Sequence, residues 1–243
     1  MEYAVLYGAI SGLALVGGAA VGIYFNFSQR VIARFMAFGA GVLVCALTFG
    51  LMEDAFSFGG FDAVTIGFLI GGLAYVLGDY LLHFYGGRNH KRRKMIETGA
   101  ITNGRAITLG AILDGIPESA ALGISLFAGH GRGFLMAMAI VISNFPEGIS
   151  SITGLKKEGY SNKKIFTTWA IVAITTLVIT ILSYIFLTDI DPNNIGIIEA
   201  FAAGAILAML ADTMMPEAYE EGGFSIGIIT VLGFLAAFIL AKF

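Results

Sequence analysis

Charged side chains are scarce in this sequence. Only 13% of its 243 residues are Asp, Glu, Lys or Arg, whereas 57% are hydrophobic, and the mean hydropathy is +0.85. A soluble domain usually has about a quarter of its residues charged. The chain therefore has too few polar side chains to cover a water-exposed globule, which excludes an ordinary soluble protein and favours lipid as the solvent.

Cysteine and histidine are also scarce. The single cysteine, Cys45, cannot form an intrachain disulfide and does not indicate a redox compartment. The chain has no Gly-x-Ser-x-Gly motif and no His-Glu-x-x-His motif. We therefore expect that the protein is not an enzyme. An intramembrane metallohydrolase remains an alternative, because acids alone can ligate a metal and leave one coordination position open.

Eight apolar runs divide the chain, and each has about the 20 residues that a membrane-spanning helix needs. The first run has no basic segment before it and exceeds the length of a signal peptide, so we interpret it as a span. We predict an all-α membrane protein with eight transmembrane helices, forming one transmembrane domain over residues 1–243. The runs cover residues 3–26, 33–56, 63–86, 104–127, 133–155, 164–187, 195–217 and 223–242.

Lysine and arginine are distributed unevenly between the two sides of this topology. If the N-terminus lies outside, 12 of these residues fall on the inner side and only Arg132 and Lys242 on the outer side. The densest basic cluster is the segment from Arg88 to Lys94. Cytoplasmic loops of membrane proteins carry an excess of Lys and Arg. We therefore expect a multi-pass protein of the cell membrane with both termini extracytoplasmic.

An internal repeat links the second and seventh predicted spans. Residues 37–56 align without gaps to residues 200–219 at an offset of 163, with seven identities in 20 positions. The alignment also pairs Asp54 with Glu217 near the ends of the two spans. Because these spans run in opposite directions, the first three and the last three spans are predicted to be inverted repeats.

A second repeat links the fourth and fifth predicted spans, which are also antiparallel. Residues 114–119 align with residues 143–148 at an offset of 29 and share a Pro-Glu pair. Inverted repeats that meet near the membrane midplane are typical of transporters. The sequence therefore predicts a 3+2+3 arrangement. Its parts are a first three-helix repeat at 1–86, a central metal-binding pair at 104–155 and a second three-helix repeat at 164–243.

The central pair of spans carries acids deep within the predicted membrane. Glu118 lies 13 residues beyond Arg105, and Glu147 lies 15 residues beyond Arg132. At 1.5 Å per residue, each glutamate is about 20 Å from a membrane surface. A lone charge at that depth is costly, by an amount that is disputed. These acids are therefore expected to be protonated, paired or bound to a cation.

Helical spacing places further oxygen atoms beside the two glutamates. Asp114 lies four residues before Glu118, while Ser143 and Asn144 lie four and three residues before Glu147. Residues at these spacings share one helix face. We predict a metal site formed by all five residues, since such a set of oxygen donors suits a divalent cation. The alternative is a structural cluster of protonated glutamates.

These features together resemble the ZIP family of divalent metal transporters over essentially the whole chain. The Phe-Ala-Ala-Gly-Ala run at 201–205 and the Pro-Glu-Ala run at 216–218 also look like the family. The resemblance implies uptake of a divalent cation such as zinc, iron or manganese toward the cytoplasm by alternating access, with one or two metals between spans four and five. It places Asp114, Glu118, Asn144 and Glu147 at the positions of the family's transport-site ligands.

Two positions depart from the family pattern. The family typically has histidine where Asp114 stands, and often histidine or glutamine where Ser143 stands. Imidazole suits zinc, whereas all-oxygen sites suit manganese, magnesium or calcium. The sequence therefore leaves the preferred metal open. A non-transporting metal sensor and a passive cation channel are the alternative functions.

The expected partners are the divalent cation substrate and the lipid bilayer, with no nucleic acid and no cofactor beyond the transported ion. Glycine-rich faces, such as the one containing Gly67 and Gly71, allow helices to pack within the chain or in a homodimer. Glu217 and Glu220 are interpreted as part of a solvated inner turn, with collection of emerging cations as the alternative. Met214 is interpreted as a packing residue.

Overall fold

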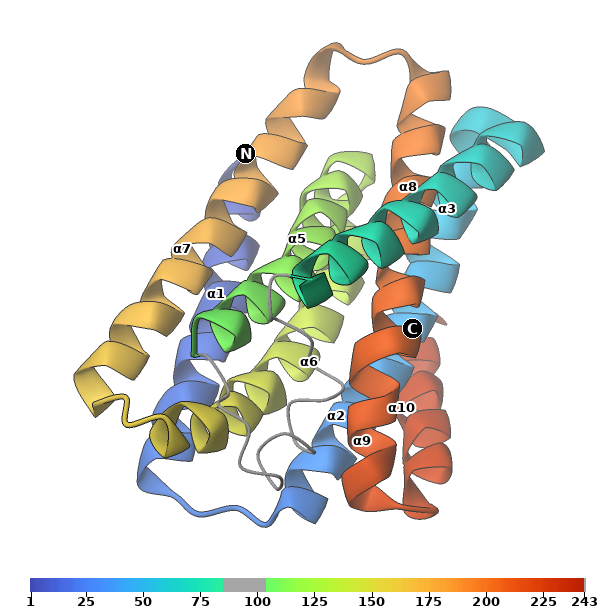
Figure 1. Ribbon diagram of the computed structural model, residues 1–243. Coiled ribbons are helices and arrows are strands. Elements are labelled where there is room, and N and C mark those ends of the chain that lie inside the picture. The colour runs from blue at the N-terminus through green and yellow to red at the C-terminus, as the bar shows by residue number, and fades with distance from the viewer. Residues whose placement is uncertain (85–103, 243) are drawn as a thin grey trace.

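The computed structural model describes residues 1–84 and 104–242, and every regular element in these ranges is helical (Figure 1). The predicted all-helical class is therefore confirmed. The basic cluster from Arg88 to Lys94, which supports the predicted orientation, lies outside the described residues. The elements are α1 (Glu2–Tyr24), α2 (Gln29–Ala46), η1 (Leu47–Met52), α3 (Glu53–Phe84), α5 (Gly104–Ala128), α6 (His130–Lys157), α7 (Asn162–Phe186), η2 (Leu187–Asp189), α8 (Pro192–Met209), η3 (Leu210–Met214), α9 (Met215–Gly222) and α10 (Ser225–Lys242).

Within the described ranges, seven helical runs are long and apolar enough to cross a membrane. The chain is thus an all-helical, multi-pass membrane protein. The eight apolar runs of the sequence correspond to seven helical runs because the second and third form one continuous run of 53 residues. The seven runs are Glu2–Tyr24, Gln29–Leu81, Thr108–Ala128, Gly133–Lys156, Asn162–Phe186, Asn194–Gly222 and Ser225–Lys242.

The long run Gln29–Leu81 is not one straight helix. A straight α-helix of 53 residues would extend about 80 Å, whereas the hydrocarbon core of a bilayer is about 30 Å thick. At Gly60 the backbone leaves the helical conformation, with φ 65° and ψ −164°. Figure 1 shows the chain changing direction between the cyan and teal parts of α3. Gly60 therefore divides this run into two arms.

Two π-helices interrupt the long runs at equivalent places. The element η1 begins at Leu47 and η3 begins at Leu210, and these positions differ by 163, the offset of the sequence repeat. π-Helices are rare and appear mostly as single turns inside α-helices, frequently at functional sites. The repeat found in the side chains is thus matched by a repeated irregularity of the backbone.

Glycines bring two pairs of helices into backbone contact. A Cβ atom added at Gly204 of α8 would lie 2.0 Å from the carbonyl oxygen of Phe68 in α3. A Cβ atom added at Gly41 of α2 would lie 2.0 Å from the carbonyl oxygen of Thr230 in α10. Small residues allow such close approach between membrane helices. Gly41 and Gly204 are again 163 positions apart, so the α2–α10 and α3–α8 pairs use equivalent glycines.

Helices α5 and α6 lie between these pairs and the α1 and α7 helices (Figure 1). Both helices continue through an internal proline, at Pro117 and Pro146 respectively. Helix α5 contacts α7 and α8, and α6 contacts α1 and α2. The acids predicted from the sequence are therefore held in the middle of the helix bundle.

Candidate cation site

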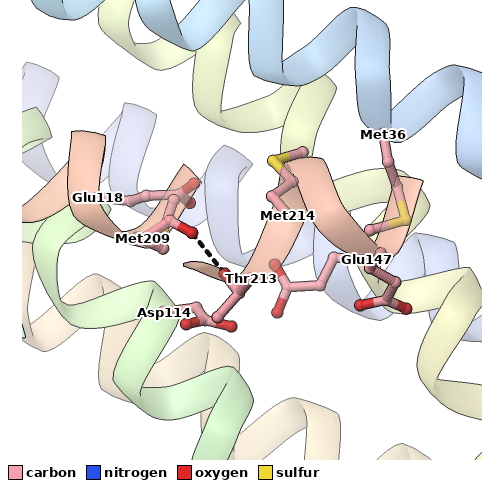
Figure 2. Close-up of a pocket in the computed structure, with 8 residues that line it drawn as sticks. Met36, Asp114, Glu118, Glu147, Met209, Thr213 and Met214 are labelled. Atoms are coloured by element: carbon pink, nitrogen blue, oxygen red, sulfur yellow. Dashed lines mark hydrogen bonds between the residues drawn. The ribbon is translucent and has the colours of Figure 1, made fainter. Parts of the chain in front are cut away.

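A pocket lies among α2, α5, α6 and the run formed by α8, η3 and α9. Three of the five residues predicted for the metal site line it, and a fourth acid joins them. The four acids are Asp114, Glu118, Glu147 and Glu217, so carboxyl groups make up half of the described lining residues. The lining residues are Met36, Asp114, Glu118, Glu147, Met209, Thr213, Met214 and Glu217 (Figure 2).

Glu118 is the most enclosed of the pocket acids, with 3% of its surface exposed. Its Oε1 atom accepts a hydrogen bond of 3.3 Å from the Ser143 hydroxyl of α6. Its Oε2 atom is buried and has no hydrogen-bond partner among the described residues. A buried polar oxygen that lacks a partner costs free energy. Glu118 therefore presents an oxygen atom suited to bind a cation or a proton.

Asp114 lies one helical turn before Glu118, and Figure 2 shows both side chains projecting from α5. The hydroxyl of Tyr75 in α3 donates a hydrogen bond of 2.5 Å to Asp114 Oδ1. Tyr75 itself is buried, with 4% of its surface exposed. Tyr75 could not be predicted as a site residue from the sequence, because it precedes Asp114 by 39 residues and belongs to another helix.

Ser143 and Asn144 are buried but do not line the pocket. The Ser143 hydroxyl contacts the carbonyl oxygen of Ile140 at 3.0 Å as well as Glu118. The Asn144 side-chain nitrogen donates to the carbonyl oxygen of Ser11 in α1 at 3.3 Å. In this conformation Ser143 thus orients a pocket acid, while Asn144 joins α6 to α1.

Glu217 corrects one interpretation of the sequence. It lies in the first turn of α9, half-buried, and the Ser150 hydroxyl of α6 donates to its Oε1 atom at 3.0 Å. The residue is therefore part of the pocket wall and not of a solvated turn, although Glu220 is exposed. The feature of the sequence that pointed to a role for Glu217 was its alignment with Asp54 in the internal repeat.

The pocket acids are not gathered around one point. In the part of the chain that the structure describes, no group of three His, Cys, Asp or Glu side chains is close enough to hold one metal ion. Asp114 and Glu118 share a face of α5, whereas Glu147 and Glu217 come from α6 and α9. Binding of one ion by three of these acids therefore requires side chains to change rotamer.

Comparison with known proteins shows a similarity to a plant protein. No family model matches the chain. A protein of Arabidopsis thaliana named "Putative zinc transporter" is 25% identical to it over 186 residues. The alignment covers 75% of this chain but 29% of the relative, so the chain spans less than a third of that protein. This similarity supports the resemblance of the chain to the ZIP family of divalent metal transporters.

Proposed function

We propose that this protein transports a divalent metal cation across a membrane through the acidic pocket. The observation that carries the proposal is Glu118 Oε2, a buried carboxylate oxygen without a hydrogen-bond partner among the described residues. Three further acids line the same pocket, namely Asp114, Glu147 and Glu217. Buried charges in proteins are normally paired or coordinate metals. A divalent cation would neutralise two of these carboxylates at once.

The proposed ligands are the five residues predicted from the sequence. Asp114, Glu118 and Glu147 supply carboxylates from the pocket wall. Ser143 orients Glu118 through its hydroxyl group and can offer the same oxygen to the ion. Asn144 offers its amide oxygen while its nitrogen stays bonded to α1. The rotamer changes that gather these groups would accompany binding of the cation.

The proposed transporter crosses the membrane eight times in the 3+2+3 arrangement. In this arrangement Gln29–Leu81 crosses twice, with Gly60 at the turn between the crossings. The excess of Lys and Arg on one side supports extracytoplasmic termini in the cell membrane. The family resemblance supports uptake toward the cytoplasm, with zinc, iron or manganese as the candidate substrates and no enzymatic activity.

Uptake into sealed proteoliposomes tests this function. Zinc, iron(II), manganese, cadmium, magnesium and calcium would each be offered to the wild type and to the Glu118→Gln/Glu147→Gln double variant. We expect saturable uptake of at least one ion by the wild type and its loss in the double variant. Asp62→Asn is the matched control, because Asp62 is exposed and is not among the residues that line the pocket.

Two results would contradict the proposal, and a third would change the mode of transport. Full uptake by the double variant would show that the pocket acids are not on the transport path. Metal binding by the folded wild type without flux of any ion would favour the alternative of a non-transporting sensor. Single-channel currents in place of saturable uptake would favour a channel.

A further inference from the structure

Three methionines line the acidic pocket together with the carboxylates. They are Met36 of α2, Met209 of α8 and Met214 of η3. Each is buried, with 4%, 2% and 8% of its surface exposed respectively. Figure 2 draws the side chains of Met36 and Met214, with their sulfur atoms, together with the acids that line the same pocket. The pocket wall therefore presents thioether sulfur as well as carboxylate oxygen.

The π-helix η3 explains why two of these methionines share the pocket. Met209 and Met214 are five residues apart, a spacing that an α-helix would place on different faces. A π-helical turn has i to i+5 hydrogen bonding, so residues five apart lie above one another. The Thr213 hydroxyl also bonds to the Met209 carbonyl oxygen at 2.7 Å inside this turn (Figure 2). The irregular backbone thus allows Met209 and Met214 both to line the pocket.

Sulfur and oxygen ligands prefer different cations. Thioether sulfur is a soft ligand that favours softer metals, whereas carboxylates and water suit magnesium, calcium and manganese. A site of oxygen atoms alone, as the sequence analysis predicted, would therefore favour the hard cations. A pocket that adds thioethers shifts this preference toward borderline and soft divalent cations such as zinc and cadmium.

We propose that Met36 and Met214 are specificity-determining residues, whose thioethers make the pocket select borderline and soft divalent cations over manganese. The inference rests on the proposed function, since it concerns the cation bound in the same pocket. It assigns a role to Met214, which was interpreted from the sequence as a packing residue, and to Met36, which the sequence pattern did not single out. It also locates the selectivity on α2 and η3, opposite the acids of α5 and α6.

The test replaces both sulfur atoms with little change in volume. Met36→Leu/Met214→Leu keeps apolar side chains of similar size, and such exchanges are usually well tolerated in packed interiors. We expect proteoliposomes with the wild-type protein to take up cadmium in preference to manganese. This uptake should be lost when Glu118 is replaced. In the variant, the ratio of cadmium affinity to manganese affinity should fall by about tenfold. Mutations of groups around a metal typically lower metal affinity by about 10- to 100-fold, and the expected change is at the lower end of that range.

Met215→Leu is the matched control for this variant. Met215 is the neighbour of Met214 in sequence and is only partly buried, but it does not line the pocket. Its replacement should leave the ratio unchanged. Isothermal titration of purified protein with cadmium and with manganese provides the same comparison without flux, so the inference can be tested even where transport is slow.

The outcomes separate the inference from the proposed function. If Glu118→Gln/Glu147→Gln abolishes uptake but the methionine variant keeps the wild-type ratio, the methionines only pack and the inference is overturned alone. A wild type that binds manganese more tightly than cadmium overturns it as well. If the ratio of cadmium affinity to manganese affinity depends on the methionines but cadmium is not transported, the inference stands and the proposed transport function fails.

Discussion

Gly60 and Gly223 lie 163 positions apart and leave their helices with nearly the same backbone conformation. Gly60 has φ 65° and ψ −164°, and Gly223 has φ 64° and ψ −148°. Each lies 13 positions after the first residue of a π-helix, at Leu47 and Leu210. The repeat detected from side chains at residues 37–56 and 200–219 therefore extends through a shared backbone turn.

Replacing either glycine with alanine should destabilise the protein through backbone strain alone. A Cβ atom at Gly60 or Gly223 would meet nothing within 4 Å, but this region of φ and ψ is essentially confined to glycine. We expect Gly60→Ala and Gly223→Ala each to lower the free energy of unfolding by about 1–3 kcal/mol, measured by thermal unfolding in detergent. Gly227→Ala is the control, because Gly227 is equally open but does not have a positive φ, and it should cause no such loss. Equal stability of all three variants would contradict the prediction.

Two adjacent glycines of α3 should differ in their sensitivity to the same substitution. A Cβ atom at Gly71 would lie 1.9 Å from the carbonyl oxygen of Phe201 in α8, whereas at Gly72 the nearest atom is 3.6 Å away. Gly71→Ala must push two backbones apart, and overpacking of this kind costs about 1–3 kcal/mol or more. We expect Gly71→Ala to reduce thermal stability and the yield of folded protein, while Gly72→Ala changes neither. Similar effects of both substitutions would mean that α3 and α8 do not pack as described.

Local sequence patterns were sufficient to predict the helices. The run 104–127 corresponds to α5 (Gly104–Ala128), and the run 223–242 corresponds to α10 (Ser225–Lys242). An uninterrupted stretch of apolar residues determines both the helix and its length in a membrane. The apolar pattern did not show that the second and third runs are joined through a kink at Gly60, because that kink depends on the backbone conformation of a single glycine.

The candidate site was predictable only in part, for a related reason. Asp114, Glu118 and Glu147 were found because depth and i, i+4 spacing are local properties of a sequence. Tyr75 and Met36 were not found, because their places depend on how distant helices pack. A π-helical turn that redirects Met214 has no signature in apolar periodicity.

The hydrogen bond from Tyr75 to Asp114 should contribute measurably to stability. Hydrogen bonds to charged groups contribute about 1.5–3 kcal/mol, and this one joins α3 to α5 within the bundle. Tyr75→Phe keeps the ring but removes the donor, so we expect a lower thermal unfolding temperature. Because Asp114 lines the pocket, the less constrained carboxylate should also bind the cation more weakly. Tyr24→Phe is the control, since Tyr24 is 73% exposed, and an unchanged Tyr75→Phe variant would refute the role of this bond.

Glu217 should contribute to cation affinity if the pocket transports a cation. Its carboxylate lines the pocket, held by the Ser150 hydroxyl at 3.0 Å. Glu217→Gln keeps the size of the side chain but removes its charge. The KM for uptake should therefore rise by about tenfold, in line with the loss of metal affinity when other groups around a metal are changed. The change in kcat should be smaller. Ser150→Ala should raise KM less, because the carboxylate stays but loses its donor. Glu220→Gln removes the same charge from an exposed position one turn later in α9. An equal rise in KM for Glu217→Gln and Glu220→Gln would indicate that general surface charge, and not the pocket, attracts the cation.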